Sequence, residues 1–138
     1  MQQNKFTCFL IGGKAEEKDG EAIAKAGGNQ VHNVCGQLSL NQSASLVKKA
    51  AYTISHDTGL MHVAAAFKQP VISVWGNTVP AFGMYPYYGN HKVKNHISEV
   101  SGLSCRPCSK IGSSQCPKGH FDCMKKQNEE AILHFIQR

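Results

Sequence analysis

The stretch "AYTISHDTGLMHVAAAFKQPVISVWGN", residues 51–77, decides the fold of this chain. It has the pattern of a short strand, a helix that is apolar nearly all round, and a second strand with a proline at its start, where a missing N–H costs least. Short connections between such elements are typical of parallel strands joined by a helical crossover. The stretch therefore predicts a buried helix, from about Thr58 to Phe67, between two strands of a parallel sheet.

The same alternation extends on both sides of this stretch. "FTCFLIGG" (6–13) and "QVHNVCG" (30–36) are short apolar runs that end in glycine, and they predict two more strands. The segment between them has acidic residues in its first turn and a closing glycine pair, and "LSLNQSASLVKKA" (38–50) resembles a capped helix start. "HKVKNHISEV" (91–100) is a candidate last strand. We therefore expect an α/β fold, a Rossmann-like parallel sheet with helices on both faces.

The length of the chain favours one domain. Its 138 residues suffice for one sizeable core and are too few for two domains of ordinary size. We expect a single domain over 1–138, with an α/β core at 1–104, a cysteine-rich loop at 105–124 and an amphipathic terminal helix at 125–138.

Composition narrows the classes of partner. A formal net charge of +6 favours anionic partners. The basic residues are spread thinly and do not interleave with aromatic residues, so we expect no nucleic-acid binding. No secretory signal is recognisable, and no stretch approaches the roughly 18 apolar residues of a membrane span. We therefore expect a cytoplasmic protein, in which the six cysteines are reduced by default.

Polar residues gather where the strand of the deciding stretch ends and its helix begins. Asp57 or Thr58 can cap the helix, and Gly59 lets a ligand approach the backbone. Exposed N–H groups and the helix dipole suit a phosphate, and His62 lies one turn later on the same face. The alternative is that Asp57 is a simple N-cap and His62 a satisfied, half-buried histidine. Both interpretations remain open from these residues alone.

Four cysteines lie within nineteen residues near the C-terminus: Cys105, Cys108, Cys116 and Cys123. Three interpretations compete: a structural zinc ion held by these thiolates, free thiols packed in a long loop, and disulfides formed on purification. A catalytic role for them is not expected. Cys8 and Cys35, in predicted strands, fit small buried apolar residues.

Four segments resemble known sequences in collinear order, from about Phe6 to Met124. "SHDTGLMHVAAAFKQPVISVWGNTVP" closely resembles the donor-binding signature of family 9 glycosyltransferases, the heptosyltransferases that build the inner core of bacterial lipopolysaccharide. "FLIGGKAEE" is similar to the family's strand, turn and acidic segment. "NVCGQLSLNQSASLVKKA" is similar to its G-x-L-S/T-L helix entry, and "LSCRPCSKIGSSQCPKGHFDCM" to its cysteine-bearing segment before the last helix.

The resemblance implies a place in a larger architecture. In such enzymes two Rossmann-like domains face each other in the GT-B arrangement, and the C-terminal one holds the nucleotide-sugar donor. This chain would be that C-terminal half, truncated at its N-terminus, either as an expressed fragment or as a truncated gene product. By position, the resemblance implies that Glu16 hydrogen-bonds the ribose and that the backbone at Leu38 meets the adenine edge.

The resemblance also assigns roles at the strand-to-helix turn. Thr58 and Gly59 would donate N–H groups to the donor diphosphate, with His62 beside them, and Asp57 would face the sugar. The implied donor is ADP-heptose. No metal ion or other cofactor is required for this binding in principle, and a structural zinc in the cysteine loop is a separate question.

The family's acceptor domain has no counterpart in the sequence. That domain would bind the lipopolysaccharide core acceptor. Any peripheral contact with the inner face of the inner membrane would belong to the full enzyme. Half a site cannot position an acceptor for attack, so no catalytic residue is assigned and the chain alone is expected to be inactive. The alternative function is a catalytically inactive nucleotide-binding or protein-interaction module with a zinc-stabilised cysteine loop.

Overall fold

The computed structural model describes residues 6–137, and the chain divides into two compact units, Met1–Leu46 and Val47–Arg138. The boundary falls within helix α2 (Leu40–Lys49). The expected single domain also includes residues 1–5 and 138, which lie outside the described residues. That domain assignment stays a prediction, and each unit is described by itself below.

The first unit contains a pair of parallel strands. β1 (Cys8–Leu10) pairs with β2 (Val31–Asn33), with Cys8 opposite Val31. The connection between them consists of one α-helix flanked by two short 3₁₀ turns: η1 (Lys14–Glu16), α1 (Glu17–Gly27) and η2 (Gly28–Gln30). Gly28 ends α1 with φ of 68°, a conformation that glycine adopts without steric cost. Both strands and the helix between them were predicted from the sequence and are confirmed.

Helix α2 begins with a reciprocal cap. The backbone N–H of Ser39 donates to Gln42 Oε1 at 2.8 Å, and the N–H of Gln42 donates to Ser39 Oγ at 3.3 Å. Such a capping box satisfies two N–H groups that would otherwise lack partners at the start of a helix. The predicted capped start is therefore confirmed.

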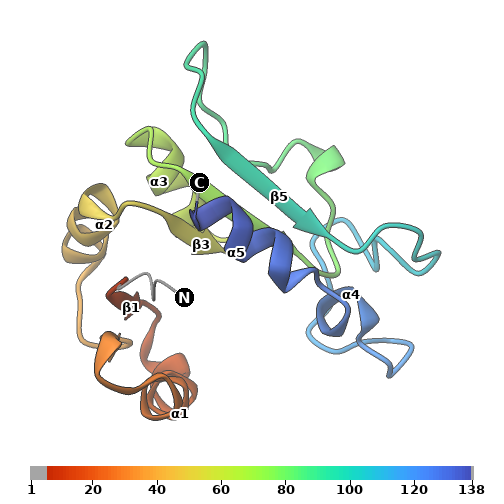
Figure 1. The fold of residues 1–138 in the computed structure, drawn as a ribbon. Coiled ribbons are helices and arrows are strands. Elements are labelled where there is room, and N and C mark those ends of the chain that lie inside the picture. The colour runs from red at the N-terminus through yellow and green to blue at the C-terminus, as the bar shows by residue number, and fades with distance from the viewer. Residues whose placement is uncertain (1–5, 138) are drawn as a thin grey trace. The chain divides into compact units, whose positions relative to one another are not determined.

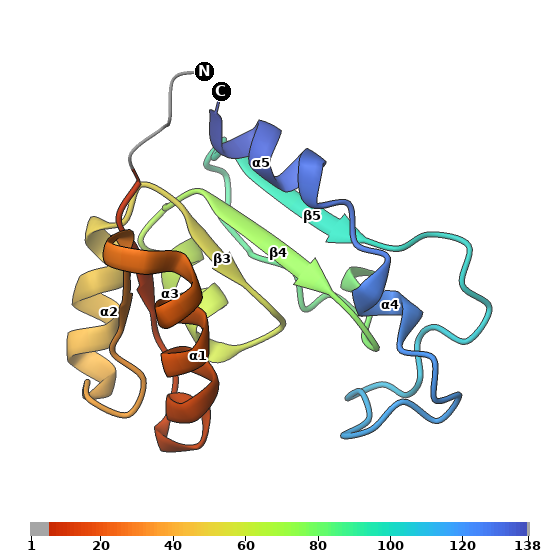
Figure 2. The same ribbon diagram turned by 60° about the horizontal axis from the view of Figure 1, so that its bottom comes forward.

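The second unit is built on three parallel strands in the order β3-β4-β5 (Figures 1 and 2; Figure 2 labels all three). β3 (Thr53–Ser55) is followed by α3 (Gly59–Ala66) and β4 (Val71–Trp75), which pairs with β3. The strand, helix and strand predicted from residues 51–77 are thus present. β5 (Asn95–Glu99) adds the predicted last strand on the other side of β4, with Trp75 opposite Glu99.

Helices cover both faces of this three-stranded sheet. Figures 1 and 2 show α3 on one face and α5 (Glu129–Gln137) on the other. Every residue of β4 is buried, and since its side chains alternate between the faces, both faces are shielded from water. Trp75 is completely buried, so its ring packs in the core. The predicted α/β sheet with helices on both faces is confirmed.

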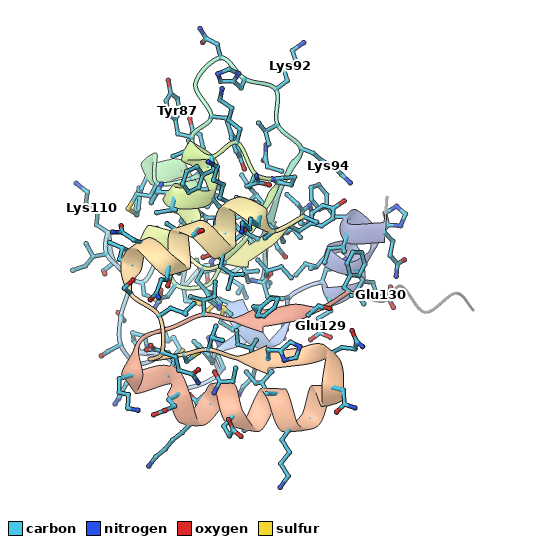
Figure 3. The ribbon with its side chains drawn as sticks, turned by 90° about the vertical axis from the view of Figure 1, so that its left-hand side faces the viewer. Tyr87, Lys92, Lys94, Lys110, Glu129 and Glu130 are labelled. Carbon is cyan, nitrogen blue, oxygen red and sulfur yellow. The ribbon has the colours of Figure 1, made fainter. Side chains whose placement is uncertain are left out.

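Lys94, just before β5, fastens α5 to the sheet (Figure 3). Its Nζ donates to the carbonyl of Phe135 at 2.9 Å and lies 4.5 Å from the centre of the Phe135 ring. A cation at the C-terminal end of a helix is favoured by the helix dipole and by the free carbonyl groups there. The Phe135 ring also lies 5.4 Å from the ring of His96.

Two expectations about helices need correction. The terminal helix does not begin at residue 125: α4 (Asp122–Lys125) is a separate turn, and α5 starts at Glu129 because Asn128 Oδ1 accepts the N–H of Ala131 at 3.1 Å. Helix α3 is not buried all round. Met61, Ala64 and Ala65 face the sheet, whereas the opposite face of this short apolar helix is open to solvent.

Candidate functional site

The turn between β3 and α3 leaves the start of the helix without a side-chain cap. Thr58 is the N-cap residue, with φ −137° and ψ 164°, and among the described residues no side chain makes the capping hydrogen bond. The Thr58 hydroxyl instead lies 2.9 Å from Ser55 Oγ. Thr58 and Gly59 are both exposed. The N–H of Met61 donates to the Thr58 carbonyl at 3.1 Å, which leaves the N–H groups of Gly59 and Leu60 as those without an intrahelical partner at this helix start.

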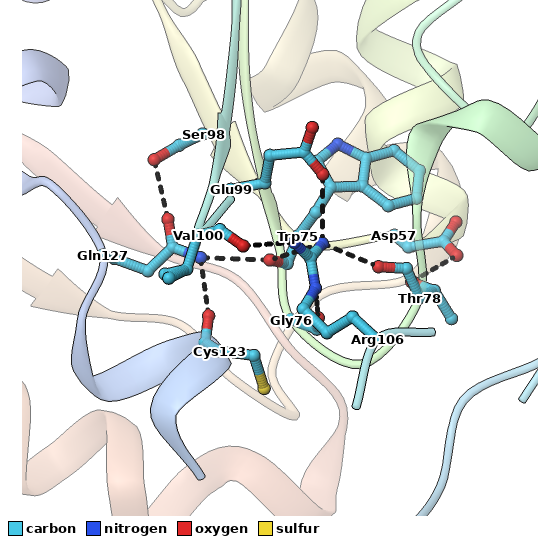
Figure 4. Close-up of polar contacts among 10 residues, drawn as sticks. All are labelled: Asp57, Trp75, Gly76, Thr78, Ser98, Glu99, Val100, Arg106, Cys123 and Gln127. Atoms are coloured by element: carbon cyan, nitrogen blue, oxygen red, sulfur yellow. Dashed lines mark hydrogen bonds and ion pairs between the residues drawn. The ribbon is translucent and has the colours of Figure 1, made fainter. Parts of the chain in front are cut away.

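Asp57 does not cap the helix either. Its Oδ2 accepts a hydrogen bond from Thr78 Oγ1 at 3.3 Å, and the side chain is half-buried (Figure 4). The interpretation of Asp57 as a simple N-cap is therefore wrong. The carboxylate is held by the segment that follows β4, because the carboxyl ends of parallel strands lie at one edge of the sheet.

His62 and Gly59 complete this turn. His62 is exposed, which contradicts the alternative that it is a half-buried core histidine. A Cβ added at Gly59 would meet nothing within 4 Å, so the space above the helix terminus is open. Open N–H groups at the end of an eight-residue helix, with a histidine one turn later, can bind an anion such as a phosphate.

In the first unit, two turns at the carboxyl ends of the strands lie side by side. The N–H of Gly36 donates to the carbonyl of Gly12 at 2.9 Å, which joins the turn after β2 to the turn after β1. Glu16 is exposed on the first turn, and Leu38 is half-buried in the bend before α2. The structure therefore brings the Glu16 and Leu38 segments to one edge, as their positions after the strands predicted.

Glu16 closes the glycine turn. The N–H of Gly13 donates to its Oε2 at 2.7 Å, and a Cβ at Gly12 would lie 3.0 Å from the Cβ of Glu16 and 3.1 Å from Cys35 Sγ. Cys35 is buried as predicted, and burial, together with the Glu16 carboxylate, raises the pKa of its thiol. Cys8 is exposed, so its predicted burial is wrong.

In the second unit, the four clustered cysteines line one pocket together with Arg106 and His120. All four carry free thiols. The Sγ of Cys105 lies 3.7 Å from His120 Nε2, and the N–H of Phe121 donates to Cys116 Sγ at 3.4 Å. This backbone donor is the main reason why the pKa of Cys116 is lowered, whereas burial raises the pKa of Cys123.

The pocket does not contain a ready-made metal centre. Across residues 6–137, no three side chains of histidine, cysteine, aspartate or glutamate are arranged to hold an ion. To bind a zinc ion, the thiols of Cys105, Cys108, Cys116 and Cys123 would have to move closer to one another. A structural zinc stays a prediction, and elemental analysis of protein purified without chelator would decide it.

Sequence reasoning missed three residues of this unit: Thr78, Arg106 and Gln127. Their side chains link the ends of the strands (Figure 4). One signal was available for Arg106. Thirteen of the fifteen basic residues are lysines, so an internal arginine is unusual in this chain and points to a need for its planar group of donors. Thr78 and Gln127 carry no comparable signal.

Comparison with known proteins agrees with this fold. The model of glycosyltransferase family 9 (heptosyltransferase) matches residues 1–118. The chain is 32% identical over 81 residues to lipooligosaccharide heptosyltransferase 2 of Haemophilus influenzae, a match that covers 56% of this chain and 23% of that protein.

Two solved structures share the fold. The structure of E. coli ADP-heptose lps heptosyltransferase II superposes with a TM-score of 0.60 at 22% identity, over 94% of this chain and 36% of that one. The glycosyl transferase family 9 structure from Veillonella parvula gives a TM-score of 0.68 at 17% identity, over 94% and 35% of the two chains. The chain thus spans less than half the length of each of these proteins.

Proposed function

The chain belongs to glycosyltransferase family 9, and from this premise we propose that the turn between β3 and α3 binds the diphosphate of a nucleotide-sugar donor. The observation that carries the proposal is the uncapped start of α3. Thr58 and Gly59 are exposed, and the Thr58 hydroxyl is turned toward Ser55. Backbone N–H groups and the dipole of a helix favour a phosphate at such an end.

The other residues of the turn have complementary roles in the proposal. His62, exposed one helical turn later, lies beside the diphosphate and adds a hydrogen bond or a positive charge. Asp57, whose carboxylate is held by Thr78, faces the sugar. In the other unit, Glu16 as the partner of the ribose and the Leu38 backbone as the partner of the adenine stay predictions from the family resemblance.

We further propose ADP-heptose as the donor and the lipopolysaccharide core as the acceptor, in the cytoplasm or at the inner face of the inner membrane. The E. coli structure is described as an ADP-heptose enzyme, and this supports the choice of donor. Within residues 6–137, no helix combines the length and the apolar character that crossing a bilayer requires. We do not propose nucleic acid as a partner.

In the proposed reaction, a hydroxyl of the acceptor attacks the anomeric carbon of the heptose and gives up its proton to a base outside the described turn. The bond from that carbon to the diphosphate oxygen breaks, and ADP leaves with the additional negative charge. Fixed N–H dipoles at Thr58 and Gly59 would stabilise that charge as it develops, without having to reorganise. The binding uses backbone donors and therefore requires no metal ion. The acceptor's attacking hydroxyl has to be placed by residues that the described turn does not supply.

Isothermal titration calorimetry with ADP, UDP and GDP tests the proposal. We expect measurable binding of ADP by the 138-residue chain and weaker binding of the other two nucleotides. The absence of binding of all three, in protein shown to be folded by circular dichroism, would contradict a nucleotide site. Equal affinity for the three nucleotides would support the diphosphate site and contradict a preference for adenine.

One observation favours a second candidate, a catalytically inactive binding module with a zinc-stabilised loop. The four thiols of the cysteine segment line a single pocket. A preparation that contains stoichiometric zinc and binds no nucleotide would support this candidate over the first.

A further inference from the structure

A buried arginine in the cysteine-rich loop makes an unusual number of hydrogen bonds. Only 6% of the Arg106 side chain is exposed. Its three nitrogens donate to five oxygens, those of Trp75, Gly76, Thr78 and Val100 in the backbone and Oε2 of Glu99 (Figure 4). A buried guanidinium requires such partners, because an unpaired buried charge is very unfavourable.

These partners lie at the carboxyl ends of two neighbouring strands. Trp75 is the last residue of β4, and Glu99 is the last residue of β5 and its partner in the sheet. Arg106 Nη1 donates to Val100 O at 2.8 Å, and its Nη2 reaches Glu99 Oε2 at 3.1 Å. The side chain therefore ties the two strand ends together at the edge where open α/β sheets bind ligands.

The same guanidinium reaches the third strand through Thr78. Arg106 Nη2 donates to the Thr78 carbonyl at 3.0 Å, and only 7% of Thr78 is exposed. The Thr78 hydroxyl in turn donates to Asp57 Oδ2 at 3.3 Å, just beyond the end of β3. Two hydrogen bonds, one to the carbonyl of Thr78 and one from its hydroxyl, thus form a path that connects Arg106 through Thr78 to Asp57, the residue before the helix cap Thr58.

We propose that Arg106 is a positioning residue for the turn between β3 and α3: it fixes Thr78, whose hydroxyl orients the Asp57 carboxylate beside the start of α3. The consequence for ligand binding rests on the proposed nucleotide-sugar function, whereas the positioning itself does not. The planar fork of arginine matches several carbonyl groups at once, which the point charge of lysine cannot do.

The loop that carries Arg106 is itself held against the segment after β4. The N–H of Cys108 donates to the Asn77 carbonyl at 2.9 Å, and Asn77 Nδ2 donates to the Ser113 carbonyl at 2.6 Å. These hydrogen bonds hold the loop next to Asn77, the residue before Thr78. The cysteine segment therefore contributes to the turn between β3 and α3 through Arg106, although its thiols do not belong to that turn.

Two variants break the path at different points. Thr78→Val keeps the shape of the side chain and removes the hydroxyl that bonds to Asp57, and Thr78→Ser is the matched control that keeps the hydroxyl. Arg106→Lys keeps the charge and loses the fork. Lys110→Ala, an exposed position on the same loop, controls for a general effect of altering the loop (Figure 3).

The first measurement needs no ligand. In ¹⁵N-labelled protein we expect the amide resonances of Asp57, Thr58 and Gly59 to shift in both Thr78→Val and Arg106→Lys, and to stay in place in Thr78→Ser and Lys110→Ala. The double variant should shift them no further than the larger single one, because both changes interrupt one path. Unmoved resonances in folded Thr78→Val would overturn the proposal.

The second measurement connects the path to binding. We expect Thr78→Val to weaken ADP binding about three- to tenfold, the effect of one lost hydrogen bond, and Thr78→Ser to bind as the unmodified chain does. If the unmodified chain binds no ADP while the resonances shift as expected, the proposed function fails and the positioning role of Arg106 stands. If ADP binds and neither variant changes its affinity or the resonances, the positioning role fails alone.

Discussion

The Oγ of Ser55 and the Oγ1 of Thr58 lie 2.9 Å apart, and this contact turns the Thr58 hydroxyl back toward β3. A threonine at the start of a helix ordinarily caps the helix with that hydroxyl. Here the cap is not made, so the N–H groups at the start of α3 remain available to an external anion.

The uncapped helix predicts opposite effects of one substitution. Thr58→Asp supplies a carboxylate that can cap α3, and it should raise the free energy of unfolding by about 0.5–1 kcal/mol. The same negative charge repels a diphosphate, so the affinity for ADP should fall. Urea denaturation and calorimetry measure the two effects, with Thr58→Ser as the control. A variant that is more stable and also binds ADP more tightly would contradict the anion site.

Gln127 joins α4 to the ends of two strands and predicts a large loss of stability. Its Nε2 donates to the carbonyls of Trp75 and Cys123 at 3.0 and 2.8 Å, and its Oε1 accepts from Ser98 Oγ at 2.8 Å (Figure 4). Gln127→Glu replaces the donor with an acceptor that faces two carbonyl oxygens. We expect a loss of about 1–3 kcal/mol in the free energy of unfolding at neutral pH.

The loss should be smaller at acidic pH, because a protonated carboxyl group can donate to one of the two carbonyls again. Chemical denaturation at pH 7 and near pH 4 measures this difference. Gln115→Glu, an exposed position in the cysteine loop, adds the same charge without facing those carbonyls and is the control. An equal loss in both variants would assign the effect to net charge.

The thiols should differ in their reactivity toward alkylation. The pKa of Cys116 is lowered chiefly by the N–H of Phe121, so its thiolate forms at lower pH, whereas burial raises the pKa values of Cys35 and Cys123. Because the thiolate is the reactive form, iodoacetamide should modify Cys116 first as the pH rises from about 6 to 9. Mass spectrometry of metal-free protein would contradict this if Cys123 reacted first.

Chelation should not affect nucleotide binding. The proposed site donates backbone N–H groups to the diphosphate, so the affinity for ADP should be the same with and without EDTA. Titrations in parallel buffers measure the difference. A tenfold loss with EDTA, in protein that stays folded, would show that a metal ion contributes to the binding, either at the diphosphate or through the cysteine segment that carries Arg106.

The strands and helices were predictable because their signals are local. Short apolar runs that end in glycine marked β1 and β2, and the resemblance of residues 38–50 to a capped helix start marked α2. The one-sided burial of α3 was not predictable, because alanine and glycine are compatible with both a buried and an exposed face. The break before α5 was predictable but missed: Asn128, followed by Glu129 and Glu130 in the first turn, is a typical helix start.

The candidate site was predictable in its location but not in its hydrogen bonds. Asp57, Thr58 and Gly59 follow a strand, and this placed them at the carboxyl edge of the sheet. Whether Asp57 caps α3 or bonds to Thr78 depends on residues 21 positions apart, which no local pattern encodes. Arg106 is likewise defined by partners on two other segments of the chain, residues 75–78 and 99–100.

The most direct test of the central claim removes one N–H from the start of α3. Proline is well tolerated at the first position of a helix, and Thr58 already has the extended conformation required before a proline. Gly59→Pro should therefore keep the fold, and Gly59→Ala is the matched control that retains the N–H. Calorimetry should show ADP affinity at least tenfold lower, about 1.4 kcal/mol, in Gly59→Pro than in Gly59→Ala. Equal affinity of the two folded variants would contradict binding of the diphosphate at this helix terminus.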